Sequence, residues 1–293
     1  LILEPLLMGL LVRFQQWILI GDLRQLPAVV AQSEELTEVR DEELRAAGIT
    51  SLGQSLFERL YLKSQAKDWH WAYGQLTHQG RMHQDIVAFP AQQFYQGHLD
   101  CLPENTTYRS HQERPIHWEL PPDANVLEQQ LSRQRVVYLP TPVDEDSATL
   151  KTNQHEARLL VDIIKAFHRL AGENGEELAA GSMGIITPYR AQIAQIRALL
   201  TEEELAPEDY TIDTVERYQG GARDIILISL CTNSERQLQS LSSLSAEGVD
   251  RKLNVAMTRA RSHLVVLGNE GILKRSPVYY ELLSLCRSAD AKA

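Results

Sequence analysis

Five short segments of the chain place charged, polar or glycine residues directly beside apolar runs. In chain order they read GDLRQLP, HQGRMH, GIITPYRAQ, DTVERYQGGARD and LNVAMTRAR. Open α/β sheets bind ligands at such points, where a polar loop follows a buried strand. Arginine side chains match the oxygens of phosphate, and glycine lets the backbone approach a ligand closely. These residue types favour an anionic ligand, although each segment alone also fits an ordinary turn.

The first two segments supply candidate polar contacts in the N-terminal third of the chain. Asp22 and Gln25 follow the apolar residues 17–20, and the alternative interpretation is a turn with a solvated glutamine. Arg81, two residues after Gln79, could clamp an anion through its guanidinium fork, and the alternative is a surface arginine. The histidines beside Arg81 lack the spacing of metal ligands, so this segment predicts no metal site.

The third segment joins an apolar run to a predicted helix. Thr187, Tyr189 and Arg190 stand between the apolar residues 183–187 and a helix over residues 191–200. A hydroxyl and a guanidinium beside a helix N-terminus can bind phosphate, and an aromatic ring can stack on a base. The alternative interpretation is an ordinary join between a strand and a helix.

The last two segments combine glycines with arginines. Gly220 and its neighbours would let a ligand approach the backbone before the apolar residues 225–231. Arg259 and Arg261 end a predicted helix over residues 250–261, where they could bind an anion or only complement the helix dipole.

The elements that must hold these segments alternate between short apolar runs and amphipathic helices, which predicts an α/β fold. The expected strands are residues 17–20, 136–139, 183–187, 225–231 and 264–267. The expected helices are residues 1–14, 51–60, 84–94, 155–171, 191–200 and 250–261. In the helix over 155–171 an apolar stripe is formed by Ala157, Leu160, Val161, Ile164, Phe167 and Ala171. Residues 98–122 and 235–247 are expected to be loops.

The composition of the 293 residues is ordinary for a globular protein, with 43% hydrophobic and 23% charged residues. No apolar run approaches the ~20 residues needed to cross a bilayer, and the apolar start lacks a basic leader, which together predict a cytoplasmic protein. Three scattered cysteines argue against a disulfide framework, a zinc module or an iron–sulfur cluster. The net charge of −10 disfavours a protein that coats DNA, so a basic groove would be local, with residues such as Arg190, Arg217 and Arg223.

Taken together and in this order, the five segments resemble the successive motifs of superfamily 1 helicases. The resemblance is closest to the branch that moves five-prime to three-prime and contains the nonsense-mediated-decay helicase and the replication helicase–nuclease. It spans the chain from Leu1 to about Gly268. It implies a RecA-like α/β P-loop NTPase fold, in which residues 1–90 are the C-terminal half of a first RecA-like domain and residues 91–293 a complete second one.

The resemblance also implies roles for individual residues. Gln25 matches the glutamine that senses the γ-phosphate of ATP, and Arg81 and Arg259 match two arginine fingers that neutralise charge on the transferring phosphoryl group. The implied nucleotide contacts are Asp22, Gln79 and Gly220. The implied nucleic-acid contacts, which touch the backbone and read no sequence, are Thr187, Tyr189, Arg190 and Thr214.

The chain departs from the family pattern at several points. The Walker A sequence GxxxxGK[ST] does not occur in it, and the carboxylates that hold Mg²⁺ are expected before Leu1. This predicts the C-terminal portion of a longer motor, inactive by itself. Gly80 stands where relatives have an aromatic residue that stacks on adenine, and Ala222 stands where relatives have a glutamate that contacts the ribose. These two departures affect contacts to the base and the sugar rather than contacts to the phosphates.

The implied activity is that of an ATP-dependent helicase or translocase. ATP and Mg²⁺ would bind between the two RecA-like domains, and the partner would be single-stranded nucleic acid, DNA rather than RNA. The alternative is a non-hydrolysing nucleic-acid-binding or scaffold protein derived from a helicase, which Gly80, Ala222 and the missing Walker segments favour. A metabolic enzyme with a dinucleotide fold is disfavoured, because no GxGxxG follows any predicted strand.

Overall fold

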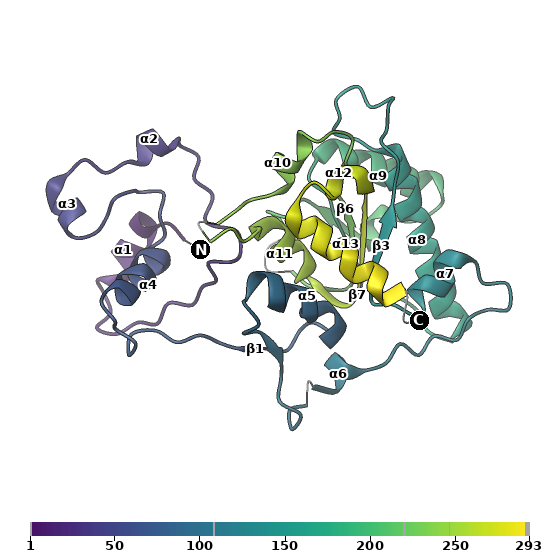
Figure 1. The fold of residues 1–293 in the computed structure, drawn as a ribbon, viewed down its shortest axis with the longest axis horizontal. Helices are drawn as coiled ribbons and strands as arrows, with labels where there is room; N and C mark the ends of the chain where they lie inside the picture. Colours follow the sequence, from purple (N-terminus) through teal and green to yellow (C-terminus); the bar gives the residue numbers. More distant parts are fainter. Residues whose placement is uncertain (1, 108, 219–220, 246, 291–293) are drawn as a thin grey trace. The chain divides into compact units, whose positions relative to one another are not determined.

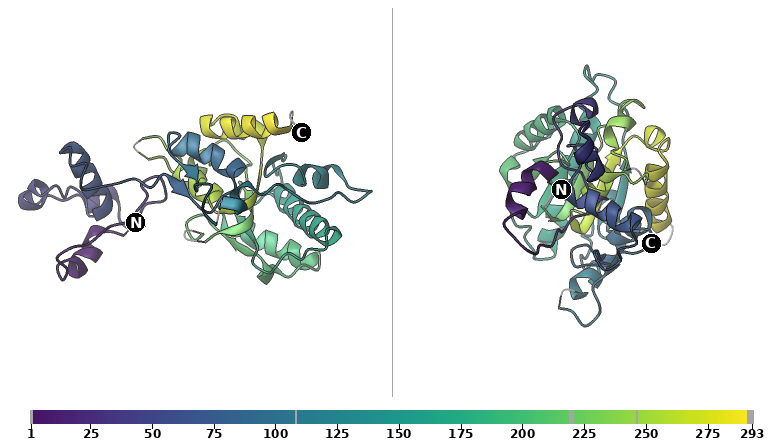
Figure 2. Two further views of the ribbon diagram at one scale, coloured as in Figure 1. Left: turned by 90° about the horizontal axis from the view of Figure 1, so that it is seen from below. Right: turned by 90° about the vertical axis from the view of Figure 1, so that its left-hand side faces the viewer.

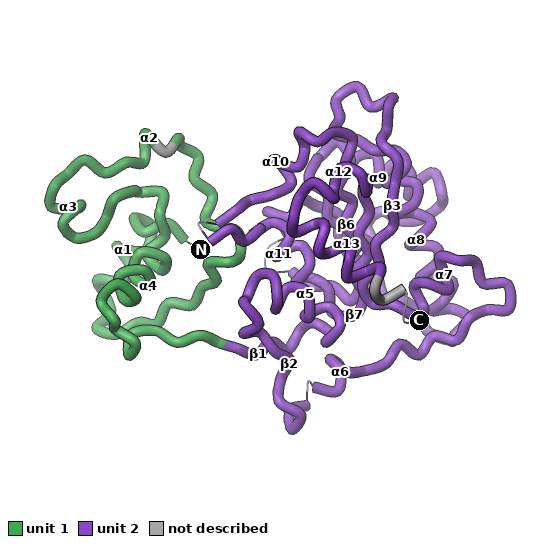
Figure 3. Tube along the Cα trace, in the orientation of Figure 1, with its two compact units in different colours: residues 1–76 green, residues 77–293 purple. Residues whose placement is uncertain are grey.

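The chain divides into two compact units, residues 1–76 and residues 77–293 (Figure 3). The computed structural model describes residues 2–107, 109–218, 221–245 and 247–290. Each unit has its own buried residues, and the regular sheet belongs to the second. None of the helices formed by the described residues has both the length and the apolar character that a membrane span needs.

The first unit consists of short helices and long irregular segments. Its helices are α1 (Glu4–Leu11), α2 (Glu34–Thr37), α3 (Glu42–Ala46) and α4 (Leu56–Ala66). The buried carboxylate of Glu4 pairs with the guanidinium of Arg59, with 2.7 Å between Oε2 and Nε, and this ion pair ties α1 to α4. Ser55 accepts the backbone N–H of Glu58 and thereby fixes the start of α4.

Residues 17–20, predicted as a buried strand, form no strand in the structure. The side chains of Ile18 and Ile20 are 89% and 88% exposed. A strand needs a neighbour to satisfy its backbone N–H and C=O groups. Among the described residues of the first unit, the only pairings of this kind are the isolated bridges Leu3–Ser55 and Glu38–Ser51. The prediction was wrong because an apolar run forms a strand only where another strand pairs with it.

The second unit is built on a five-stranded sheet in which every pair of neighbours is parallel. The strands, in spatial order, are β3 (Val136–Pro140), β7 (Ala260–Gly268), β6 (Arg223–Ser229), β4 (Met183–Ile186) and β5 (Thr211–Asp213). Because all five run the same way, their amino ends share one edge of the sheet and their carboxyl ends share the other. A separate two-residue parallel pairing joins β1 (His78–Gln79) to β2 (Asp100–Cys101).

Helices cover both faces of this sheet (Figures 1 and 2). One face is covered by α8 (Gln154–Glu173) and α9 (Arg190–Glu202), with α7 (Val126–Leu131) beside α8. The other face is covered by α5 (Gln84–Phe94), α11 (Arg251–Met257) and α13 (Pro277–Asp290). The predicted α/β architecture is therefore confirmed. The remaining short elements are α6 (Arg109–Glu113), α10 (Gln237–Leu241), α12 (Glu270–Leu273) and a 3₁₀ turn, Pro207–Asp209.

The core lies between α8 and the sheet, as the apolar stripe predicts. Every residue of that stripe is buried, and Ile163, Ala166 and Leu170 extend it. Asn153 caps α8 by accepting the N–H of Glu156 at 2.9 Å. Capping and burial of one helix face thus agree with the sequence pattern.

Several boundaries differ from the sequence interpretation. Residues 98–122, expected to be a loop, contain β2 and α6, and residues 235–247 contain α10. β5 was not predicted, because it has only three residues and only Ile212 among them is buried. Along the chain, the first unit ends at residue 76, whereas the predicted domain boundary falls at residue 90, inside α5. Since α5 contacts β7 and α11, it belongs with the second unit, and the correspondence between units and RecA-like domains stays a prediction.

Candidate functional site

The candidate residues of the second unit lie at two opposite edges of its sheet. Arg259 directly precedes β7, so it stands at the edge formed by the amino ends of the strands. Thr187 directly follows β4 and Thr214 directly follows β5, so both stand at the edge formed by the carboxyl ends. This separation was not predicted from the sequence.

Arg259 is held where α11 ends and β7 begins. Its side chain is almost fully buried, at 2% exposure. The Nε donates to the carbonyl of Val255 at 3.1 Å and Nη1 donates to the carbonyl of Gly221 at 3.2 Å. Gly220, predicted to contact nucleotide, lies outside the described residues, but its neighbour Gly221 is thus bound directly to Arg259. The glycine-bearing segment and the last motif therefore meet at one place.

Arg81 lies in a tight turn, residues 79–82, beside the same place. The Oε1 of Gln79 accepts the backbone N–H groups of Arg81 at 2.8 Å and of Met82 at 2.7 Å, so this side chain shapes the turn. The Nη1 of Arg81 donates to the carbonyl of Thr258 at 2.8 Å. Because Thr258 directly precedes Arg259 in the chain, the side chain of Arg81 reaches the backbone next to Arg259.

A third arginine, Arg261, lies near Arg81 and is paired with Asp224 at 3.4 Å. Burial lowers the pKa of Arg81, and the nearby guanidinium of Arg261 lowers it further. A partly desolvated cluster of guanidinium groups is a favourable environment for an anion, since a bound anion relieves their mutual repulsion and accepts their N–H groups. The arrangement therefore suits the phosphate groups of a nucleotide.

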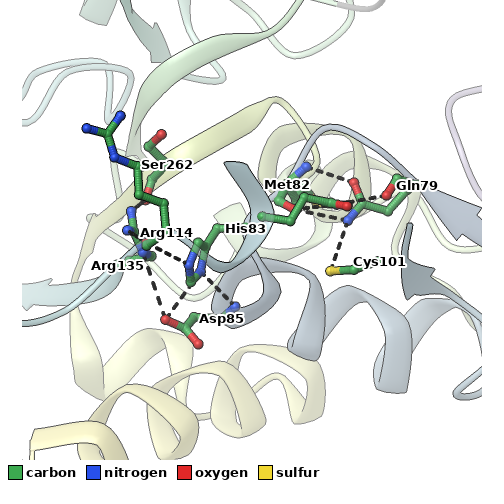
Figure 4. A network of polar contacts seen from close by, with 9 residues as sticks. Gln79, Met82, His83, Asp85, Cys101, Arg114, Arg135 and Ser262 are labelled. Atoms are coloured by element: carbon green, nitrogen blue, oxygen red, sulfur yellow. Dashed lines mark hydrogen bonds and ion pairs between the residues drawn. The ribbon is translucent and has the colours of Figure 1, made fainter. Parts of the chain in front are cut away.

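A second set of side chains connects the Arg81 turn to the sheet (Figure 4). The backbone N–H of His83 donates to the carbonyl of Arg261 at 2.8 Å, and the Nε2 of His83 lies 3.1 Å from the carbonyl of Arg114. The buried Arg135 donates to the carbonyl of Ser262 at 2.9 Å. These residues were not identified from the sequence. One feature of the sequence could have pointed to Arg135: it stands directly before a predicted strand. In the structure Arg259 also stands directly before a strand.

Asp85 is the acidic member of this set. Its Oδ2 lies 3.3 Å from Nδ1 of His83 and 4.0 Å from Nε of Arg135. The hydrogen bond from His83 lowers the pKa of Asp85, and the positive charge of Arg135 adds to the effect. Asp85 therefore stays ionised and links the start of α5 to the amino edge of the sheet.

Gly80 is the point at which the turn departs from the family sequence. A Cβ atom at this position would lie 2.9 Å from Cδ1 of Leu102. Leu102 thus occupies the space into which a side chain at position 80 would project. The glycine and the leucine fit each other, which gives the departure a structural cause.

At the carboxyl edge the candidate contacts lie on adjacent strands. Thr187 is fully buried, its backbone N–H donates to the carbonyl of Asp213 at 3.2 Å, and its Oγ1 has no hydrogen-bond partner among the described residues. The hydroxyl of Tyr189 lies 2.8 Å from Oγ of Ser240, whereas Arg190 is exposed at the start of α9. The N–H of Thr214 donates to Oδ1 of Asp213 at 2.8 Å.

A mostly apolar pocket opens beside Thr187. Its lining includes Pro188, Val215, Lys252 and Tyr279. The Nζ of Lys252 lies 3.3 Å from Oε1 of Glu216, so the pocket carries a paired cation at its rim. The edge thus combines hydroxyls, an aromatic ring and a guanidinium, which suits contacts to a nucleic-acid backbone and to base faces.

Two carboxylates of the chain itself lie at the carboxyl ends of β3 and β6. Oδ2 of Asp144 accepts the first N–H of α8, from Gln154, at 2.8 Å. Glu156, which the sequence did not single out, accepts the N–H groups of Cys231 at 2.7 Å and Thr232 at 2.9 Å. Burial raises the pKa of Glu156 to about 6. These carboxylates occupy the edge at which an α/β sheet usually binds an anion, whereas the arginines stand at the opposite edge.

In the first unit, Asp22 and Gln25 form one turn. Oδ1 of Asp22 accepts the N–H of Arg24, and Oδ2 accepts the side-chain amide of Gln25, both at 2.9 Å. Both candidate side chains predicted in this segment are therefore brought together. Among the described residues, no group of three or more histidine, cysteine, aspartate or glutamate side chains could hold a metal ion.

The sequence matches known proteins over nearly its whole length. The AAA domain family matches residues 52–271. Regulator of nonsense transcripts 1 from Dictyostelium discoideum is 30% identical over 286 residues, which cover 96% of this chain and 18% of the relative. The DNA replication ATP-dependent helicase/nuclease DNA2 from Mus musculus is 31% identical over 291 residues, 94% of this chain and 24% of the relative.

Two further comparisons extend this list. DNA polymerase alpha-associated DNA helicase A from Saccharomyces cerevisiae is 29% identical and covers 90% of this chain and 35% of the relative. Among solved structures, the C-terminal domain of a protein titled a possible DNA helicase, from Lactobacillus, is 16% identical, with a TM-score of 0.35; the alignment covers 70% of this chain and 95% of that domain. The chain spans between 18% and 35% of the length of the curated relatives named above.

Proposed function

The chain belongs to the superfamily 1 helicases of the type that includes regulator of nonsense transcripts 1 and DNA2, with a RecA-like α/β fold, and from this we propose that it is the C-terminal motor portion of an ATP-dependent translocase. Hydrolysis of ATP between two RecA-like domains would drive movement along a single strand of nucleic acid. DNA is the proposed strand, and the cytoplasm the proposed location.

The observation that carries the proposal is that Arg81 and Arg259 lie at the same edge of the sheet. The side chain of Arg81 donates to the carbonyl of Thr258, and Arg259 follows Thr258 in the chain, directly before β7. Two guanidinium groups at one edge can neutralise charge that develops on the oxygens of a transferring γ-phosphoryl group. An arginine in this role contributes ~10³–10⁵ in rate.

The other candidate residues fit the same proposal. Gln25 would sense the γ-phosphate, and Asp22, Gln79 and the segment containing Gly220 would hold the nucleotide. At the carboxyl edge the contacts to the strand would come from Thr187, Tyr189, Arg190 and Thr214. Mg²⁺ would neutralise charge on the phosphates, but we assign no step to it through this chain, because the described residues gather no set of metal ligands.

The segment between β5 and β6 carries candidate residues for both edges. Thr214 directly follows β5, and Gly221, which accepts a hydrogen bond from Arg259 at 3.2 Å, lies two residues before β6. This proximity in the chain is compatible with a motor in which binding of the strand and of the nucleotide are coupled.

The alternative, a non-hydrolysing nucleic-acid-binding protein derived from a helicase, rests on Gly80 and Ala222. Gly80 supports it, because a glycine supplies no aromatic ring to stack on a base, and Leu102 fills the space beside it. Phosphate contacts do not depend on that position, so this observation weighs less than the arginine pair.

The experiment that tests the proposal measures ATP hydrolysis by the full-length protein. Arg259→Ala is expected to lower kcat by at least ~10³-fold and to leave ATP binding largely intact. Arg197→Ala, at an exposed position on α9, serves as the matched control. Unchanged turnover in Arg259→Ala would refute the assignment, and absence of hydrolysis in the parent protein would favour the alternative. Stimulation by single-stranded DNA compared with RNA tests the preferred strand.

A further inference from the structure

Gln112 is a fully buried glutamine in α6, a short helix within the segment that the sequence presented as a plain loop. Its exposed fraction is 0%. A buried amide must find partners for its donors and its acceptor, and a surface loop seldom supplies them. The partners of Gln112 therefore show what this segment is folded around.

The side-chain amide of Gln112 binds both ends of the turn that carries Arg81. Its Nε2 donates to the carbonyl of Gln79 at 2.8 Å and to the carbonyl of Met82 at 2.9 Å. Its Oε1 accepts the backbone N–H of Leu102 at 2.9 Å. One side chain thus joins residues 79 and 82 to each other and to the segment that fills the space beside Gly80.

The turn is closed from inside and from outside. From inside, Oε1 of Gln79 accepts the N–H groups of Arg81 and Met82. The Nε2 of Gln79 also donates to the carbonyl of Met82 at 3.0 Å. From outside the turn, Gln112 donates to the carbonyls of Gln79 and Met82. With both sets in place, the backbone at Arg81 is fixed, and its guanidinium reaches the carbonyl of Thr258.

We infer that Gln112 is a positioning residue for Arg81: it sets the backbone of the turn and so holds the guanidinium at the end of α11. The inference rests on the proposed function, in which Arg81 contacts the γ-phosphoryl group. Loss of the two donated hydrogen bonds removes the donor to the carbonyl of Gln79 and leaves the carbonyl of Met82 with the side-chain amide of Gln79 as its donor, at 3.0 Å, so the turn is held less tightly. Misplacement of a catalytic group by about 1 Å can cost ~10²-fold in rate.

Two substitutions separate the donors of Gln112 from its volume. Gln112→Glu keeps the size and the acceptor for the N–H of Leu102 but removes both donors. Gln112→Leu removes all three hydrogen bonds. Gln129→Leu is the matched control, because Gln129 also donates to a carbonyl, that of Ala124 at 3.0 Å, next to α7. Arg81→Ala reports the full contribution of the arginine.

The experiment combines kinetics with hydrogen–deuterium exchange on the full-length protein. Gln112→Glu and Gln112→Leu are expected to lower kcat for ATP hydrolysis between ~10-fold and ~10²-fold, with the Kd for ATP changed less than ~3-fold. Amide exchange in residues 79–82 should accelerate in both variants, and it should stay unchanged in Gln129→Leu. A fall in melting temperature shared with Gln129→Leu, without the selective loss of kcat, would indicate a merely structural role and overturn the inference.

The outcomes also distinguish this inference from the proposed function. If Arg81→Ala lowers kcat and the Gln112 variants do not, the inference is refuted and the function stands. If Arg81→Ala itself leaves kcat unchanged, the proposed function fails. In that case the exchange data still decide whether Gln112 fixes the turn, and unaltered exchange at residues 79–82 would refute that as well.

Discussion

His263 provides a direct test of how tightly the amino edge of the sheet is packed. The ring lies in β7, stacks on Trp118 with 5.1 Å between centroids and a 6° angle between planes, and meets the edge of Phe167 at 5.4 Å. It is buried, and its Nε2 has no hydrogen-bond partner among the described residues. Burial, and to a smaller extent the positive charges of Arg135, His83 and His117, together lower the pKa of His263 to about 3.

This depressed pKa makes the second unit sensitive to acid. In the unfolded chain the same histidine binds a proton near its ordinary pKa of 6.5. The unfolded state therefore gains protons first as the pH falls, so the stability is fully present above pH 6.5 and is lost below it. With a folded pKa of about 3, the loss between pH 8 and pH 5 is about 2 kcal/mol. Glu156, whose raised pKa has the opposite effect, partly offsets this loss in the unmodified protein.

His263→Phe keeps an aromatic ring in the stack and removes the titrating group. The expected result is that the free energy of unfolding falls about 2 kcal/mol less between pH 8 and pH 5 than in the unmodified protein. Urea denaturation at the two pH values, followed by tryptophan fluorescence, measures this difference. His155→Phe, at an exposed position on α8, is the control. Equal pH dependence in His263→Phe and the unmodified protein would refute the argument that His263 is buried in its neutral form.

Three further substitutions test the packing and the edge assigned to nucleic acid. Glu156→Gln should cost about 1–3 kcal/mol of unfolding free energy, because an amide group replaces an acceptor facing backbone N–H groups; an unchanged urea midpoint would contradict this. Gly184→Ala should destabilise the protein by about 1–3 kcal/mol, because the added Cβ would overlap the Tyr218 hydroxyl. Gly172→Ala is the control, because its Cβ would enter open space, and in a thermal melt it should be neutral or stabilising. Arg190→Ala should weaken binding of single strands equally across sequences and reduce the salt dependence by about one phosphate contact in titrations, and a sequence-selective loss would argue against a backbone contact.

Much of the second unit could be predicted from its sequence, because local pattern and tertiary contact agree there. The apolar stripe of α8 packs on the sheet, and the runs before residues 187 and 231 become β4 and β6. The same reasoning failed at residues 17–20, where the apolar pattern is present and the pairing partner is not. Apolar periodicity reports what a segment can bury, whereas a strand depends on a neighbour that the pattern does not specify.

The candidate site was predictable in its residues and not in its geometry. Motif resemblance selected Arg81 and Arg259, but nothing in the sequence indicated that the carbonyl of Thr258 joins them, 177 residues after Arg81. Gln112 gave no signal at all, because a single glutamine in a polar segment resembles any solvated residue. Its role depends on its hydrogen bonds to Gln79, Met82 and Leu102, which only the folded chain brings together.

In the proposed motor, Arg81 and Arg259 act together on one phosphoryl group. The most direct measurement is a double-mutant cycle on single-turnover ATP hydrolysis by the full-length protein, with Arg81→Ala, Arg259→Ala and the double substitution, each saturated with ATP and single-stranded DNA. Residues that act as a unit are strongly non-additive, so the double variant should be about as slow as the slower single variant. Joint action would be refuted if the two losses of rate multiply in the double variant. It would also be refuted if the single variants hydrolyse ATP at the rate of the unmodified protein.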